Sequence, residues 1–225
     1  MEKYSGRMKS LKPLMHESWY EYLLPFLCSE EGDVIFEYLK EDNKRYNIFP
    51  ESNKIFNAFK VPFKDVKVVI LGQDPYYTKG VATGYAFGVN KDFRIAPSLH
   101  NIIKEVKRTE GDKEFDKTLK SWVDQGVLLI NTAFTVREGQ PNSHSKIWNS
   151  FINFVFSTLN YNKSNLVYLL WGNHAKGYKK LIDENNHILE SSHPSPLAKG
   201  FVGNNHFKLT NEILSKNDKR KIKWI

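Results

Sequence analysis

The sequence has a single cysteine, Cys28, and no long apolar run. One cysteine excludes an intramolecular disulfide framework and a cysteine-rich zinc or iron–sulfur site. No run approaches the ~18 apolar residues that a membrane span requires. The polar stretch from Met1 to Lys12 lacks the apolar core of a secretion signal. We therefore expect an intracellular protein that is not associated with a membrane.

Signatures of metal and nucleotide sites are also missing. The seven histidines are scattered and form neither an HxxxH nor an HExxH pair, so we predict no metal site. No GxxxxGK phosphate loop occurs, and the spacing of Gly80, Gly84 and Gly88 does not match a dinucleotide fingerprint. These absences leave a hydrolytic reaction without a cofactor as the simplest enzymatic class.

Positive charge is in excess. Lys and Arg number 33 against 25 Asp and Glu, which gives a formal net charge of +8 and a pI near 9.3. This balance favours an anionic partner, either nucleic acid or an acidic surface, although lysines that only keep a protein soluble would give it equally. The 225 residues fit one domain. We expect a helical part at about 1–60 and an α/β core at about 61–225.

Short apolar runs alternate with helical patterns from residue 66 onward. The runs that predict strands are Val66–Leu71, Val127–Ile130, Leu166–Trp171 and the weaker His187–Leu189. Helical spacing predicts helices at His16–Leu27, Val34–Lys40, Ser98–Lys107, Phe115–Gln125, Ile147–Leu159, Ala175–Asp183 and Phe207–Leu214. Strands that alternate with helices indicate an α/β fold with a largely parallel, buried sheet.

Polar residues follow each predicted strand. Asp74, Asn131, Asn173 and His193 lie just beyond the four C-terminal ends. In an open parallel sheet the binding crevice lies beyond the carboxyl ends of the strands. We therefore expect these side chains to converge on one pocket.

Asp74 and His193 have side chains suited to hydrolysis. A carboxylate at a strand tip orients or deprotonates a water, or stabilises a cation, although Asp-Pro-Tyr-Tyr is also a type I turn sequence. No carboxylate lies near Asp74 in sequence, so a two-carboxylate glycosidase pair is not evident. A neutral imidazole in the stiff loop with Pro194 and Pro196 can donate to a developing oxyanion, whereas a lone histidine is more often a surface residue.

Asn131 and Ser98 have side chains suited to binding. A carboxamide both donates and accepts hydrogen bonds and so matches the Watson–Crick edge of a base, although satisfying a backbone turn is an equal alternative. Ser98 follows Pro97 and precedes a helical pattern. We predict that it is a helix N-cap and that the helix start faces an anion such as phosphate.

Six short motifs are spread along the chain. They are Gly72-Gln73-Asp74-Pro75-Tyr76, Ala86-Phe87, Pro97-Ser98-Leu99, Leu129-Ile130-Asn131-Thr132, Trp171-Gly172 and His193-Pro194-Ser195-Pro196-Leu197. In this order they resemble the family-1 uracil-DNA glycosylases over nearly the whole chain. The resemblance implies a monomeric three-layer α/β/α sandwich around a four-stranded, largely parallel sheet. It also implies hydrolysis of the N-glycosidic bond of deoxyuridine in DNA, without a metal or cofactor.

The resemblance implies chemical roles for the residues at matching positions. Asp74 would position the attacking water and stabilise the oxocarbenium-like sugar. His193 would donate a neutral hydrogen bond to uracil O2 as the base leaves. Asn131 would pair with uracil N3–H and O4 and so reject cytosine, and Gln73 would shape the water and base site.

The resemblance also implies how the base is held and how the DNA is bound. Phe87 would stack on uracil, and Tyr76 would exclude the methyl group of thymine. Because a base inside a duplex is inaccessible, the deoxyuridine is flipped out. Leu197 would fill the vacated stack, while Ser98 and Ser195 would contact phosphates.

The implied partners are uracil-containing DNA, single- or double-stranded, and a small inhibitor protein that mimics DNA. The implied setting is a bacterial cytoplasm, with a viral or nuclear setting left open. Three positions depart from the family pattern. Tyr77 and Thr83 each replace a common histidine, and only Ala198 and Lys199 separate Leu197 from Gly200, where the family often has about four residues.

The sequence is also compatible with three rival functions. A nuclease would ordinarily need a carboxylate cluster for metal, and the strand ends offer Asp74 alone. A silent DNA-binding relative would not need Asp74 and His193. A glycosylase with wider base tolerance would not need Tyr76 and Asn131.

Overall fold

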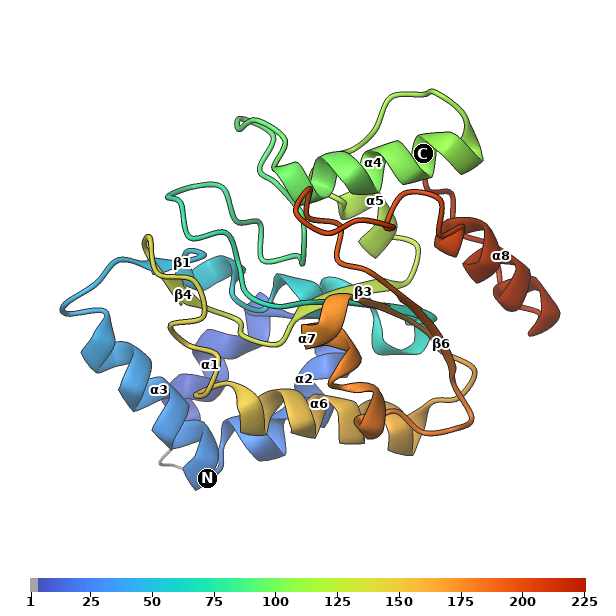
Figure 1. Cartoon of the computed structure of the whole chain (residues 1–225). Helices are drawn as coiled ribbons and strands as arrows, with labels where there is room; N and C mark the ends of the chain where they lie inside the picture. Colours follow the sequence, from blue (N-terminus) through green and yellow to red (C-terminus); the bar gives the residue numbers. More distant parts are fainter. Residues whose placement is uncertain (1–3) are drawn as a thin grey trace.

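The computed structural model describes residues 4–225 and has a parallel sheet at its centre (Figure 1). The four strands are β2 (Val68–Gly72), β3 (Val127–Asn131), β5 (Val167–Trp171) and β6 (His187–Ser191), in the spatial order β3-β2-β5-β6. All neighbours pair in parallel. The four predicted strands are confirmed, with ends shifted by one or two residues. β2, β3 and β5 are buried throughout, as their unbroken Val, Ile and Leu runs require.

Helices cover both faces of the sheet, which confirms the predicted α/β/α layering (Figure 1). One face carries α4 (Pro97–Glu110), the short α5 (Lys120–Val123) and α8 (His206–Lys216). The other carries α1 (Ser5–Leu11), α2 (Glu17–Leu27), α3 (Glu30–Asp42) and α6 (Asn149–Asn162). The apolar side chains between these layers join into one core cluster that runs from Leu11 to Trp224.

The predicted helix Phe115–Gln125 is wrong over most of its length. Only Lys120–Val123 is α-helical. The Asp116 carboxylate accepts hydrogen bonds from the backbone N–H groups of Thr118 and Ser121, and Leu119 has a left-handed φ of 62°. These local bonds replace the first helical turn, because an aspartate that binds nearby backbone competes with helix formation.

The predicted helix Ala175–Asp183 is also corrected. A short helix, α7 (Gly172–Lys176), begins three residues earlier, and a 3₁₀ turn (Lys179–Leu181) follows it. Gly177 separates the two, and its N–H bonds to the carbonyls of Asn173 and His174. Glycine is a poor helix residue, so the periodic pattern does not continue through it.

A small second sheet fastens the N-terminal helices to the loop after β3. β1 (Ile48–Phe49) pairs antiparallel with β4 (Val136–Arg137). Beside it the Arg137 guanidinium binds Asp42 at the end of α3, with Nε and Nη2 at 2.8 and 2.6 Å from the carboxylate oxygens. The buried ring of His144 reaches the same carboxylate at 2.9 Å. These bonds fix the turn at residues 138–145, which approaches the carboxyl ends of the central strands.

Over residues 4–225, no helix combines the length and apolar character needed to cross a membrane. The division into parts at about residue 60 and the cytoplasmic location stay predictions.

Candidate functional site

A pocket of about 190 Å³ lies beyond the carboxyl ends of β2 and β3. Its walls include Gln73, Asp74, Tyr76, Tyr77, Phe87, Ser98, Asn131 and His193. All of the predicted site residues except Ser195 and Leu197 therefore meet at one cavity. Those two lie in the loop that follows His193. Asn173 does not line this pocket, because it lies exposed in the first turn of α7.

Asn131 reaches the pocket across a glycine. Gly72 and Asn131 are direct neighbours in the β2–β3 register. A Cβ atom on residue 72 would lie only 2.2 Å from Asn131 Oδ1, so only glycine leaves room for the amide. Asn131 is 6% exposed, and within residues 4–225 its amide makes no hydrogen bond. Because Asn131 lines the pocket, its amide is available to bind a ligand there.

Asp74 follows β2 and is partly buried. Its Oδ2 accepts the backbone N–H of Asn142 at 2.7 Å, and the amides of Gln73 and Asn142 bond to each other beside it. Burial raises the pKa of Asp74, while the Asn142 N–H and the nearby His174 partly offset this rise. Asp74 is thus a carboxylate with enhanced basicity, which is the property needed to orient or deprotonate a water.

His193 is held as a neutral donor. Its Nδ1 lies 3.0 Å from the N–H of Ser195, and since that group is a donor, Nδ1 is the acceptor. Burial, and then the nearby His174, lower the pKa of His193 below its ordinary value. The neutral ring therefore carries its proton on Nε2. Gly172, with φ of 88°, allows the close approach, because a Cβ there would lie 2.8 Å from His193 Cβ.

Two aromatic residues line the pocket. Phe87 adopts a left-handed φ of 65°, which is rare outside glycine and indicates a backbone held by its surroundings. Its ring centroid lies 5.7 Å from that of Trp171 and 6.1 Å from that of His193. The Tyr76 hydroxyl donates to the Phe87 carbonyl at 3.1 Å. The pocket therefore contains a flat apolar surface beside polar groups.

The outer edge is made by the start of α4 and the loop after His193. Ser98 is not the N-cap that we predicted. α4 has Pro97 at its first position and Ala96 as the N-cap, since the fixed φ of proline favours that first position. Ser98 still lines the pocket. Leu197 is 97% exposed, and Tyr77 is 46% exposed.

The sequence did not point to three residues that support the site. Asn142 binds Asp74, Asn101 Nδ2 donates to the Pro194 carbonyl at 2.8 Å, and His174 Nε2 lies 2.8 Å from the Thr132 hydroxyl. Asn142 follows Pro141 in a turn-like stretch, but local sequence carries no signal for a contact with Asp74.

No metal site is evident among residues 4–225, where no three His, Cys, Asp or Glu side chains are grouped to hold an ion. The pocket instead combines a basic carboxylate, a neutral imidazole donor, an unpaired amide and an aromatic surface. This set can bind a flat heterocycle by its edge and face, and can support attack by water next to it.

Residues 59–215 match the family model described as the Uracil DNA glycosylase superfamily. Curated relatives agree with this match. The uracil-DNA glycosylase of Borrelia duttonii is 46% identical over 218 residues, covering 93% of this chain and 98% of that protein. That of Buchnera aphidicola is 46% identical over 198 residues, covering 84% of this chain and 90% of that protein.

Solved structures give the same result. The crystal structure of mimivirus uracil-DNA glycosylase aligns with a TM-score of 0.88 at 30% identity, covering 95% of this chain and 88% of that one. A variant of the mimivirus enzyme in complex with UGI also aligns with a TM-score of 0.88, at 29% identity and with 95% and 90% coverage.

Proposed function

The chain belongs to the uracil DNA glycosylase superfamily, and we propose how its pocket releases uracil from DNA. The enzyme hydrolyses the N-glycosidic bond of deoxyuridine in DNA, leaving an abasic site as a step of base excision repair. We assign it to family 1 within the superfamily on the strength of the six motifs, five of which contribute residues to the lining of the pocket.

Departure of the base is assigned to Asp74 and His193. As the C1′–N1 bond breaks, positive charge develops on the sugar and negative charge on uracil. Ionised Asp74 stabilises the sugar, orients the water that attacks C1′, and accepts the proton that this water releases. The neutral Nε2–H of His193 donates to uracil O2 and stabilises the leaving anion without transferring its proton. The observation that carries this assignment is the bond from the Ser195 N–H to His193 Nδ1, which leaves Nε2 protonated.

Recognition of uracil is assigned to Asn131, Tyr76 and Phe87. The Asn131 amide donates to uracil O4 and accepts from N3–H, which cytosine cannot match because its donor and acceptor are exchanged. Tyr76, fixed by its bond to the Phe87 carbonyl, occupies the space beside C5 and rejects thymine. Phe87 stacks on the ring, and Gln73, bonded to the Asn142 side chain, shapes the water and base site.

Contact with DNA is assigned to Ser98, Ser195 and Leu197. The two hydroxyls bind phosphates, which positions the enzyme but reads no sequence. The exposed Leu197 fills the gap left when the deoxyuridine flips out of a duplex. Counterions are released where Lys and Arg, which exceed Asp and Glu by 33 to 25, neutralise phosphates, so binding weakens steeply as salt rises.

We also propose that this chain binds an inhibitor protein, and that it acts as a monomer on both forms of DNA. The mimivirus relative forms a complex with UGI, which supports binding of a DNA-mimicking inhibitor protein here as well. Such an inhibitor would compete with DNA for the Leu197 loop. A single chain supplies every group assigned above to release and recognition of the base, which supports action as a monomer on both single- and double-stranded DNA.

The test is release of uracil from a single-stranded oligonucleotide that contains one deoxyuridine, with EDTA present. We expect release of uracil alone, no release from a thymine-only control, and a loss of at least about a hundredfold in Asp74→Asn. Tight, salt-sensitive DNA binding without release would overturn the assignment and indicate a silent DNA-binding relative. Activity that EDTA abolishes would indicate a metal-dependent reaction.

A further inference from the structure

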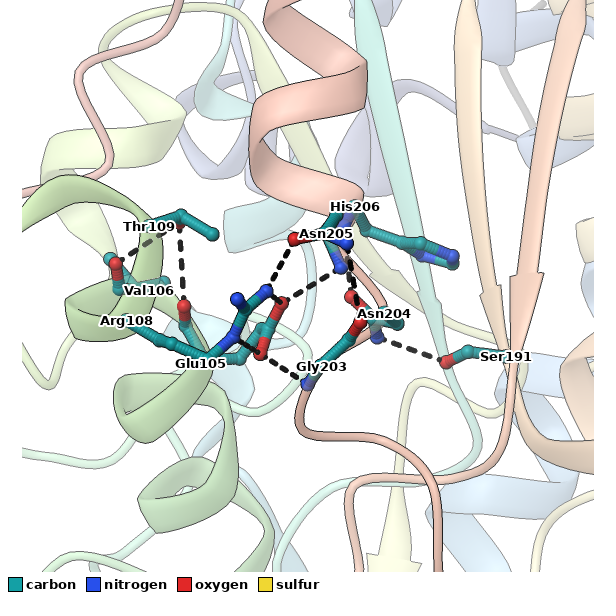
Figure 2. Close-up of polar contacts among 9 residues, drawn as sticks. All are labelled: Glu105, Val106, Arg108, Thr109, Ser191, Gly203, Asn204, Asn205 and His206. Carbon is teal, nitrogen blue, oxygen red and sulfur yellow. Dashed lines mark hydrogen bonds and ion pairs between the residues drawn. The ribbon is translucent and has the colours of Figure 1, made fainter.

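Glu105 lies on α4, outside the uracil pocket, and is fully buried. Its carboxylate accepts four hydrogen bonds (Figure 2). Arg108 donates from Nε and Nη2 at 2.9 Å each, Gly203 N–H donates at 2.6 Å and Asn205 N–H at 2.9 Å. Burial alone would raise the pKa of Glu105, but these donors outweigh it and hold the pKa below its ordinary value. The group is therefore a buried, ionised carboxylate with its partners in place.

Two of these donors belong to the backbone of residues 203–205, which we call the anchor turn. The Asn204 side chain ties the same turn to β6, because its Nδ2 lies 3.2 Å from the Ser191 hydroxyl (Figure 2). Its Oδ1 accepts the N–H of His206 at 2.9 Å, where α8 begins. The anchor turn is thus fixed to α4, β6 and α8 together.

The segment between Ser191 and the anchor turn carries His193, Ser195 and Leu197. α4 holds both ends of it. Asn101 Nδ2 donates to the Pro194 carbonyl at 2.8 Å, and Glu105 holds Gly203 and Asn205. Residues four apart on a helix share one face, so a single face of α4 makes both attachments.

Leu197 stands between the two attachments. Phe201 lies between Leu197 and the anchor turn and packs on Trp171, with 5.0 Å between the ring centroids, so a change at the anchor turn reaches Leu197 by shifting Phe201. Leu197 is 97% exposed and its N–H bonds to Ser195 Oγ at 3.3 Å. His193, in contrast, bonds to the Ser195 N–H and also packs against Gly172. Loss of the anchor turn therefore disturbs Leu197 more than His193.

We propose that Glu105 is a positioning residue that sets how far Leu197 projects toward a DNA duplex. This proposal rests on the role of Leu197 proposed above. The proposal predicts different effects on the activity toward single-stranded DNA and the activity toward duplex DNA. Uracil in a flexible single strand reaches the pocket without a filled stack, whereas uracil in a duplex needs Leu197 in the vacated space.

The test compares kcat and KM for the same deoxyuridine strand, alone and annealed to its complement. In Glu105→Gln an NH₂ group replaces one carboxylate oxygen. This group faces N–H donors and cannot accept their hydrogen bonds, and the negative charge is lost. We expect kcat/KM on the duplex to fall about tenfold, through KM, and kcat/KM on the single strand to change less than about twofold. A purely structural defect would lower the folded fraction of the enzyme. It would therefore reduce the activity on both substrates by the same factor.

Two reference variants make the result decisive. Leu197→Ala should itself lower the duplex reaction selectively, and adding Glu105→Gln to it should lower the duplex reaction little further, because both act through one loop. Asp116→Asn is the matched control, since Asp116 is also a carboxylate that accepts two backbone N–H groups, but in a different loop. It should leave the ratio of duplex to single-strand activity unchanged.

Hydrogen exchange provides a readout that does not depend on activity. The N–H groups of Gly203 and Asn205 should exchange faster in Glu105→Gln than in the parent. Arg108→Met, which removes two donors from Glu105 and keeps its charge, should shift the duplex ratio in the same direction by a smaller factor. It carries the test if Glu105→Gln does not fold.

Each failure has its own pattern. If Leu197→Ala leaves the ratio unchanged, the proposed role of Leu197 is wrong, and the Glu105 proposal falls with it. If Leu197→Ala changes the ratio while Glu105→Gln or its substitute Arg108→Met does not, only the positioning role of Glu105 is overturned.

Discussion

The backbone N–H of Asn142 lies 2.7 Å from Asp74 Oδ2, although the two residues are 68 positions apart. Asn142 adopts a left-handed φ of 65°. The turn that carries it is held from behind, where Arg137 and His144 bind the Asp42 carboxylate. The position of Asp74, which we assign as the general base, therefore depends on a turn that is bonded to the N-terminal helix α3.

The donor from Asn142 is a backbone group, so its side chain matters less than its conformation. In Asn142→Gly, the left-handed φ is accessible and the N–H stays in place, while only the bond from Gln73 to the Asn142 side chain is lost, so we expect kcat to fall by no more than about threefold. In Asn142→Val, a β-branched residue resists this φ and moves the N–H away, so we expect kcat to fall about tenfold or more. Steady-state uracil release measures both, and equal losses in the two variants would contradict this explanation.

The space over Gly72 is reserved for the Asn131 amide. A methyl group in Gly72→Ala would lie 2.2 Å from Asn131 Oδ1, so the amide must leave its position. We expect kcat/KM for uracil-DNA to fall about a hundredfold, as when a specific base contact is lost. Gly6→Ala is the control, because a Cβ at residue 6 meets no atom within 4 Å. Comparable activity of the two variants would show that Asn131 tolerates displacement.

Asp74 is kept in a setting that favours its neutral form, and this has consequences for both pH and stability. Burial raises the pKa of Asp74, so activity should rise with pH around a value above the ordinary aspartate pKa. The pKa of His193 is lowered, so activity should stay level through the pH range where a free histidine titrates. The sign for stability is opposite. A carboxyl whose pKa is raised on folding lowers stability at pH values above that pKa.

Asp74→Asn, which loses most of its activity, should therefore have a melting temperature at pH 7 that is higher by about 2 °C or more. The amide oxygen of the new side chain can still accept the Asn142 N–H. The gain should vanish at a pH low enough to protonate Asp74 in the parent. Calorimetry at both pH values tests this, and a lower melting temperature in Asp74→Asn at pH 7 would contradict it.

Structural features encoded by local sequence can be predicted from it, whereas contacts between distant residues cannot. The apolar runs predict the four strands, and the parallel topology then places Asp74, Asn131 and His193 at one edge. The bond between Asn142 and Asp74 has no such rule, because it depends on how a long loop folds back. The helix predicted at Phe115–Gln125 fails because the Asp116 side chain binds backbone that a helix would otherwise use.

The loop that carries Leu197 is held by hydrogen bonds within the protein itself. Pro194 is bound by Asn101, Ser195 accepts the N–H of Leu197 and the carbonyl of Ser195 accepts that of Ala198. Ordering backbone costs roughly 1–2 kcal/mol per residue at ordinary temperature, and here that cost falls on folding, not on association. Docking of Leu197 into a duplex should accordingly carry little entropic penalty from the protein. The free energy needed to open the DNA should then be the largest cost of binding.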